Sequence, residues 1–137
     1  MIDESDTSLL DSTAIHEGFR SEMYICPAGR LSIGYGYNLE AGMSEREARA
    51  LMILKYEEIF TGLTRHAWWE SLSDGRQRAL AEMAYQLGAA GLLRFQRMLS
   101  AIEAGDFDSA ADEMLDSQWA EQTPSRARHC ADLMRAG

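Results

Sequence analysis

The sequence predicts a mainly α-helical domain of the α+β class, with a small β-hairpin lobe, a helical lobe and a cleft between them. Over residues 18–42, glycines and Pro27 separate short apolar runs, a pattern typical of turns and short strands. From residue 44 onward, apolar residues recur every three or four positions, as on one face of a helix. A chain of 137 residues fits one domain, expected over 1–137, and is long enough to bury its own core.

The elements of the first half follow from local signals. Residues 7–17 are expected to form a helix that ends at Gly18, a residue suited to the position after a helix. Residues 18–42 then form the hairpin lobe, and residues 44–64 form a connecting helix. The helical lobe is expected to combine residues 7–17 with residues 65–137. The apolar side of the first helix is expected to consist of Leu9, Leu10, Ala14 and Ile15.

Capping signals place the remaining helices. Ser44 and Glu47 have the spacing of a capping box at the start of the connecting helix. Thr123 and Pro124 are expected to serve as N-cap and first residue of the last helix. Between these points the apolar spacing predicts helices from about 73 to Gly88, over 92–104 and over 106–114, and the last helix runs to about 135.

Charge and composition exclude several functional classes. The formal net charge of −9 argues against nucleic acid as a partner, because phosphate binding needs a basic surface. No apolar run is long enough for a membrane span, and the acidic N-terminus has no signal-peptide core. The three histidines are far apart, so no metal site and no cofactor are expected. A bridge between Cys26 and Cys130 stays open, since sequence alone gives no distance.

Glu17 is the first candidate for chemistry because it lies at the carboxyl end of the first predicted helix. Unpaired carbonyls and the negative end of the helix dipole disfavour a further negative charge there. A partly buried carboxyl group that keeps its proton suits a general acid. Taken alone, the residue could equally be a surface glutamate before a helix-ending glycine.

A fixed spacing links Glu17 to two further polar side chains. Eight residues separate Glu17 from Cys26, and five separate Cys26 from Ser32, which leads into Ile-Gly-Tyr-Gly. This pattern resembles the phage-type lysozymes, glycoside hydrolase family 24, in which a glutamate, an aspartate or in some members a cysteine, and a threonine have the same spacing. Further segments resemble the family in the same order from about residue 10 to 135: residues 16–19, 82–95 and 119–127.

The resemblance implies a phage lysozyme-like fold and a muramidase that hydrolyses the β-1,4 bond between N-acetylmuramic acid and N-acetylglucosamine in peptidoglycan. In that activity Glu17 protonates the departing glycosidic oxygen. Cys26 faces the anomeric carbon, where it helps a water attack or stabilises the oxocarbenium-like transition state, and Ser32 holds the water.

The resemblance also assigns supporting roles in the helical lobe. Arg126 is expected to pair with Glu17. Tyr85 and Gln86 are expected to line the sugar cleft, the ring by stacking and the amide by hydrogen bonding. Glu82 departs from the family, because it stands where relatives carry an asparagine.

Cys26 is the departure that matters most for the mechanism. A free thiol is mostly uncharged at neutral pH, so it lacks the fixed charge of an aspartate unless an arginine or a backbone donor lowers its pKa. Three interpretations are open: an active cysteine variant, an enzyme gated by a disulfide at Cys26, or a weakened relative. In an active enzyme the thiol is either a base or a nucleophile. Ser32 keeps the hydroxyl of threonine but not the methyl group that fixes its rotamer.

The expected biological role is that of a phage endolysin for host lysis. The expected partners are peptidoglycan glycan strands, with no nucleic acid and no stable membrane insertion, and a monomer is expected. The chain is expected to stay in the host bacterial cytoplasm until a holin-type pore releases it to the cell wall. The alternatives are a lysozyme-fold module that binds glycan or protein, with weakened or redox-gated activity, and a muramidase carried by a virion or delivered by secretion. The acidic charge favours the binding module, whereas the presence of Glu17 and Arg126 favours the endolysin, because a binding module needs no acid at a helix carboxyl end.

Overall fold

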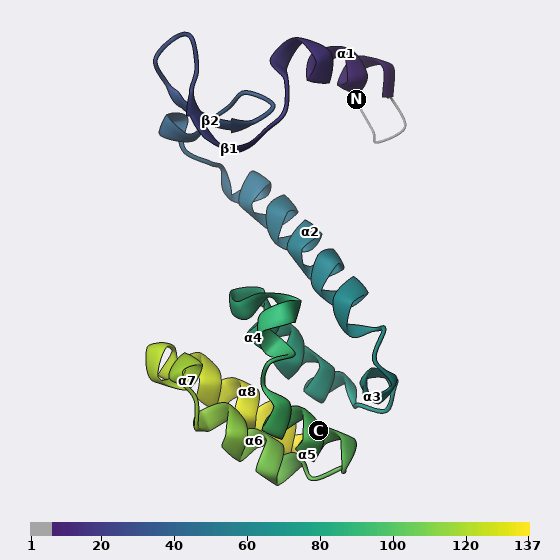
Figure 1. Cartoon of the computed structure of the whole chain (residues 1–137). Helices are drawn as coiled ribbons and strands as arrows, with labels where there is room; N and C mark the ends of the chain where they lie inside the picture. The colour runs from purple at the N-terminus through teal and green to yellow at the C-terminus, as the bar shows by residue number, and fades with distance from the viewer. Residues whose placement is uncertain (1–6) are drawn as a thin grey trace. The chain divides into compact units, whose positions relative to one another are not determined.

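The computed structural model describes residues 7–137, which form eight α-helices, one short 3-10 helix and three strands (Figure 1). The predicted mainly helical architecture with a small sheet is therefore confirmed. The residues fall into two compact units, 1–49 and 50–137, each taken by itself below. The expected lack of a signal segment concerns Met1–Asp6, which lie outside the described residues.

The N-terminal unit consists of α1 (Thr7–Glu17), β1 (Arg20–Ile25), β2 (Leu31–Gly34), β3 (Tyr37–Asn38) and the 3-10 helix η1 (Leu39–Ala41). The strands form one antiparallel sheet in the order β1-β2-β3. Helix α1 ends as predicted, because the Gly18 N–H donates to the Ala14 carbonyl at 2.9 Å and Gly18 has a φ of 69°. This ending turns the chain from the helix directly into β1.

The predicted apolar side of α1 is not buried. Leu9 and Leu10 are about half exposed and Ile15 is largely exposed. Ala14 is half-buried, and no residue of α1 is fully buried. Within the described structure, these side chains therefore add nothing to the buried core. The grouping of residues 7–17 with the helical lobe, and the cleft between the lobes, stay predictions.

Helix α2 (Glu45–Leu63) begins with the predicted capping box. The Ser44 N–H donates to Glu47 Oε2 at 2.8 Å, and the Glu47 N–H donates to Ser44 Oγ at 3.2 Å. Two otherwise unpaired donors are satisfied at the start of the helix. Near the other end, Ile59 and Leu63 are buried, so this part of α2 belongs to the core of the second unit.

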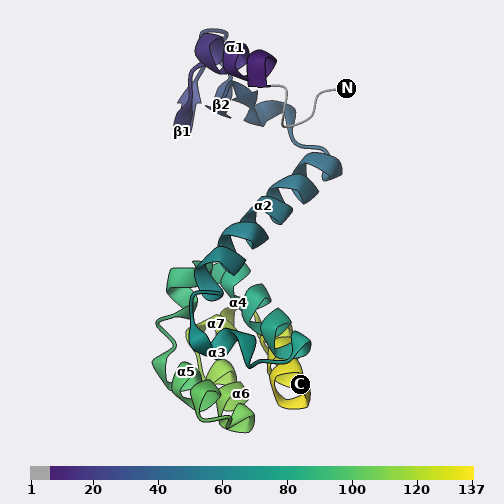
Figure 2. The ribbon, with the colours of Figure 1, turned by 90° about the vertical axis from the view of Figure 1, so that its right-hand side faces the viewer.

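The second unit continues with α3 (Ala67–Glu70), α4 (Asp74–Leu92), α5 (Gln96–Glu103), α6 (Phe107–Leu115), α7 (Gln118–Gln122) and α8 (Pro124–Ala136). These helices gather into one bundle in which α8 packs against both α4 and α6 (Figure 2). Its core holds the largest fully buried side chains, which are Leu63, Leu80, Met83, Leu92, Met98, Met114, Met134 and Cys130. None of the helices within residues 7–137 is long and apolar enough to cross a membrane.

Several helix ends differ from the prediction. Gly88 breaks α4 as expected, with a φ of 74°, but a helical turn follows it up to Leu92. Helix α5 begins at Gln96 rather than at 92. The prediction started too early because the apolar spacing of the helix continues back through residues 93–95, which are not helical. The Thr123 side chain does not cap α8. Thr123 directly follows α7, a helix that was not predicted, and its hydroxyl donates to the Trp119 carbonyl of that helix at 2.9 Å.

Arg76, in the first turn of α4, binds the last turn of α8. Its Nε donates to the Met134 carbonyl at 2.8 Å, and a terminal nitrogen donates to the Arg135 carbonyl at 3.4 Å. The guanidinium carbon also lies 3.6 Å from the centre of the Phe107 ring. A cation at a helix carboxyl end satisfies unpaired carbonyls and opposes the helix dipole. One side chain therefore joins three helices.

We expect Arg76→Ala to lower the free energy of unfolding by about 2 kcal/mol, because charge-assisted hydrogen bonds and a cation–π contact are lost. Arg78→Ala is the matched control, since it removes only an exposed ion pair with Asp74. That pair contributes less than about 0.5 kcal/mol. Urea unfolding of both variants measures the difference, and equal shifts would contradict the assignment.

Candidate active site

A cavity of about 540 Å³ lies within the N-terminal unit. It brings together the three predicted catalytic residues, Glu17, Cys26 and Ser32. They come from the end of α1, the turn after β1 and the middle strand of the sheet. The cavity is lined by His16, Glu17, Arg20, Tyr24, Cys26, Pro27, Ala28, Arg30, Ser32, Gly36 and Asn38.

The Glu17 carboxylate lies against the backbone of Gly36. A Cβ atom added at Gly36 would lie 2.5 Å from Glu17 Oε2, so any side chain there would displace the carboxylate. Gly36 also has a φ of 73°, which favours glycine. Glu17 itself is exposed, so the partial burial assumed from the sequence is wrong for the described structure. Its position rests on the end of α1 and on the absence of a side chain at residue 36.

Cys26 closes the turn between β1 and β2. Its N–H donates to the Arg30 carbonyl at 2.8 Å, and its carbonyl accepts from the Gly29 N–H at 2.8 Å. Its Sγ accepts a hydrogen bond from the Arg30 N–H at 3.4 Å. This backbone donor lowers the pKa of the thiol, with further hydrogen bonding from Ala28 and Ser32, against the opposing effect of desolvation. A backbone donor, one of the causes considered from the sequence, therefore favours the thiolate.

Ser32 is buried at the centre of the sheet, where it is 2% exposed. It is paired with Tyr24 on β1 and with Asn38 on β3. Its hydroxyl donates to the Arg30 carbonyl at 3.2 Å. Because a hydroxyl rotates, the same proton can instead be offered to the Cys26 sulfur. The Arg30 carbonyl and the Cys26 sulfur are thus two acceptors for the Ser32 hydroxyl, and they orient a side chain that lacks the methyl group of threonine.

Arg126 lies in the helical unit, half-buried on α8. Its Nε is 3.9 Å from Glu82 Oε2, and the other oxygen of Glu82 is 3.4 Å from His129 Nε2. The carboxylate that replaces the family asparagine is therefore the partner of Arg126 within this unit. The pairing of Arg126 with Glu17 stays a prediction.

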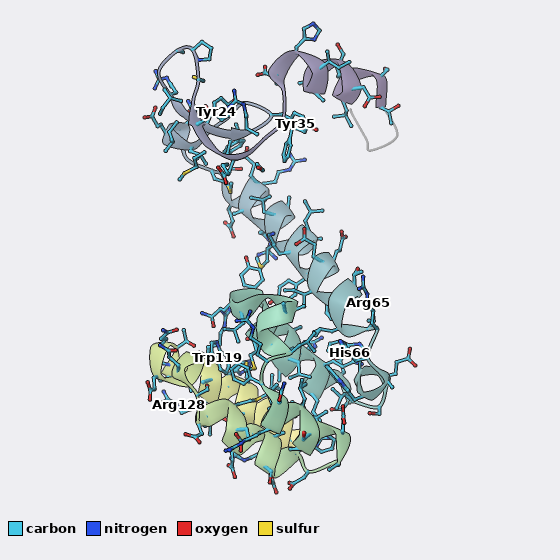
Figure 3. The ribbon with its side chains drawn as sticks, in the orientation of Figure 1. Tyr24, Tyr35, Arg65, His66, Trp119 and Arg128 are labelled. Atoms are coloured by element: carbon cyan, nitrogen blue, oxygen red, sulfur yellow. The ribbon has the colours of Figure 1, made fainter. Side chains whose placement is uncertain are left out.

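Tyr85 and Gln86 also lie in the helical unit, on α4. The Tyr85 ring stacks on Tyr56, with centres 5.2 Å apart, and lines a second cavity of about 400 Å³. Gln86 Oε1 accepts a hydrogen bond at 2.8 Å from the indole nitrogen of Trp119, a residue labelled in Figure 3. The carbonyl of Gln86 thus has a structural partner, which leaves its amino group for a ligand. Their contacts with sugar stay predictions.

Arg20 and Tyr24 line the first cavity, although the sequence did not single them out. The guanidinium carbon of Arg20 lies 4.9 Å from the centre of the Tyr24 ring, which is labelled in Figure 3. Both residues belong to β1, where the pairing with β2 is irregular between them. No sequence signal marks this irregularity, so their proximity could not be predicted.

Cys130 differs from Cys26 in burial and in the direction in which its thiol pKa is shifted. It is fully buried in the helical core, and burial raises its pKa to about 12, with a smaller contribution from Glu82. Both cysteines are free thiols in the structure. A buried, protonated thiol is a poor partner for disulfide exchange. A redox lock at Cys26 would therefore need a thiol other than that of folded Cys130.

Across residues 7–137, histidine, cysteine and acidic side chains nowhere gather in groups of three that could hold a metal ion. The cavity contains three groups that can take part in a reaction: the carboxyl group of Glu17, the thiol of Cys26 with its lowered pKa, and the hydroxyl of Ser32. These three groups suit proton transfer and the activation of a water molecule.

Comparison with known proteins gives a family match over most of the chain. A family model described as phage lysozyme matches residues 14–134. The pre-baseplate central spike protein of Enterobacteria phage T4 is 38% identical over 69 residues, which cover 50% of this chain and 12% of that protein. Two probable T4-type lysozymes of Dictyostelium discoideum are 28% and 26% identical, each over 96% of this chain and 95% of the relative.

We expect Gly36→Ala to displace the Glu17 carboxylate, because the new methyl group occupies its place. Gly29→Ala is the matched control: Gly29 has a similar φ of 82° but nothing within 4 Å of an added Cβ. Each variant should lose about 1 kcal/mol of stability from backbone strain. The side-chain carboxyl carbon of Glu17, followed by NMR, should shift only in Gly36→Ala. An unchanged signal would contradict the close approach.

We expect Cys26 alone to react with iodoacetamide in the folded protein, because the thiolate is the attacking form. The rate should rise with pH through a pKa below the ordinary value of a free thiol. Peptide mass spectrometry identifies the labelled residue, and Cys26→Ser should remove the labelling. Modification of Cys130 at the same rate in the folded chain would show that the core is open.

Proposed function

Because the chain belongs to the phage lysozyme family, we propose that it is a muramidase that hydrolyses the β-1,4 bond between N-acetylmuramic acid and N-acetylglucosamine in peptidoglycan. One observation carries the proposal: Glu17, Cys26 and Ser32 line a single cavity. The family match spans all three positions. The finer assignment to glycoside hydrolase family 24 rests on the spacing of these residues.

Glu17 is the general acid in this proposal. Its proton passes to the departing glycosidic oxygen as the bond to the anomeric carbon breaks. Glu17 is the last residue of α1 and lines the cavity together with Cys26 and Ser32, which supports the role. The bare backbone of Gly36 leaves room for the carboxyl group beside the cavity.

Cys26 and Ser32 act on the other side of the bond. The lowered pKa of Cys26 gives the thiol part of the negative character that an aspartate has. As a base, the thiolate takes a proton from a water held by the Ser32 hydroxyl, and that water attacks the anomeric carbon. As a nucleophile, the sulfur itself bonds to that carbon before water releases the sugar. The first course inverts the anomeric configuration and the second retains it.

The helical unit supplies the supporting residues in the proposal. The resemblance to the family assigns Arg126 as the partner of Glu17; within the helical unit its Nε lies 3.9 Å from Glu82 Oε2. Tyr85 offers a ring face already backed by Tyr56, and Gln86 offers its free amino group to the glycan. The partner is a glycan strand of peptidoglycan, and the protein acts as a monomer.

The biological role proposed is that of a phage endolysin, held in the host cytoplasm until a holin-type pore releases it to the cell wall. A virion-associated muramidase is the alternative, since the T4 relative is named as a spike protein. The match covers only 12% of the spike protein, so the similarity does not carry the role of that protein in the phage particle over to this chain.

We expect Glu17→Gln to reduce the release of reducing sugar ends from purified peptidoglycan by at least about a hundredfold, because the proton donor is lost. Glu22→Gln is the matched control: Glu22 is an exposed glutamate on β1 that does not line the cavity, so its rate should match the parent. Mass spectrometry of the products identifies the bond that is cut.

Equal rates for the parent and Glu17→Gln would overturn the mechanism. Binding of peptidoglycan without hydrolysis by either protein would instead favour the glycan-binding module. The anomer first formed by the parent, read by NMR, separates the two roles of Cys26, since inversion indicates a base and retention a nucleophile.

A further inference from the structure

We propose that Arg20 binds a carboxylate of the glycan substrate inside the cavity that holds Glu17 and Cys26. The inference rests on the proposed muramidase function and names the chemical group that this part of the site recognises. Arg20 begins β1, is exposed, and lines the cavity together with the predicted catalytic residues.

The guanidinium of Arg20 lies over the Tyr24 ring, and the sheet is irregular between these two residues. From Arg20 to Tyr24, β1 advances four residues, while its partner β2 advances only two, from Gly34 to Ser32. The guanidinium carbon of Arg20 lies 4.9 Å from the ring centre of Tyr24. Stacking on the ring limits the motion of the side chain and leaves its N–H donors free at the edge.

Within residues 7–137, no acidic side chain neutralises the charge of Arg20, because no carboxylate there lies within ion-pair distance of its guanidinium. The chain has 22 acidic residues and only 13 lysines and arginines, so acidic residues are more numerous than the cations they could pair with. The neighbouring Arg30, in contrast, lies 4.0 Å from Glu40. As far as the structure describes the chain, this cation in the cavity is therefore available to an anionic ligand.

The glycan offers one kind of anion that fits this cation. A planar guanidinium binds a carboxylate through two parallel hydrogen bonds. The muramic acid residues carry a lactyl carboxyl group, which is either free or joined to a peptide that has carboxylates of its own. A polymer of N-acetylglucosamine alone carries none. Arg20 thus distinguishes muramic acid strands from neutral chitin-like strands, through either source of carboxylate.

The test compares three ligands on the Glu17→Gln protein, which binds glycan without cutting it. The ligands are a neutral chito-oligosaccharide, a peptide-free muramyl glycan and a peptide-bearing muramyl glycan. Adding Arg20→Gln should raise the calorimetric Kd for a carboxylate-bearing ligand about tenfold, as for one charge-assisted pair, and leave the neutral ligand unchanged. Weakening with the peptide-free glycan identifies the lactyl group, and weakening with the peptide-bearing glycan alone identifies the peptide.

Two further variants separate recognition from general effects. Arg46→Gln removes the same charge from α2, outside the cavity, and should leave every Kd unchanged. Arg20→Lys keeps the charge without the flat donor face, so it should recover only part of the loss. Equal weakening with all three ligands, or the same loss in Arg46→Gln, would overturn the role of Arg20. Failure of the Glu17→Gln protein to bind any of the ligands would overturn the proposed function itself.

Discussion

The peptide backbone of Arg30 is the group on which the geometry of the cavity depends. Its carbonyl accepts hydrogen bonds from the Cys26 N–H and from the Ser32 hydroxyl. Its N–H donates to the Cys26 sulfur and is the first cause of the lowered thiol pKa. One residue thereby closes the hairpin turn, orients the hydroxyl and favours the thiolate. Since these bonds come from the backbone, they do not depend on the Arg30 side chain.

Glycine at residue 36 is the second constraint, because it leaves space for the Glu17 carboxyl group. The acid and the thiol are positioned in different ways. Glu17 depends on the end of α1 and on an empty place above a glycine, whereas Cys26 depends on a ring of backbone hydrogen bonds. Substitutions can therefore affect one group without the other, and this separates their contributions to any activity.

Local signals in the sequence predicted much of this arrangement. Gly18, the Ser44–Glu47 capping box and the break at Gly88 were readable because each needs only neighbouring residues. Features that depend on contacts with another helix or strand could not be predicted. The Thr123 hydroxyl turns to a carbonyl of α7 instead of capping α8, and the burial assumed for Glu17 is absent. Arg20 and Tyr24 were missed because two extra residues in β1 leave no mark in the apolar pattern.

The sheet pairings that shape the cavity all join residues close in sequence, the most distant being Arg20 with Gly34. Short loops are closed at low entropic cost, and contacts between near neighbours form early in folding. The bundle, in contrast, must bring α4 and α8 together across the length of three intervening helices. The reactive groups of the hairpin therefore acquire their arrangement from a nearly self-contained stretch of chain. Slow or imperfect assembly of the bundle would therefore leave the hydrogen bonds around the Cys26 thiol intact.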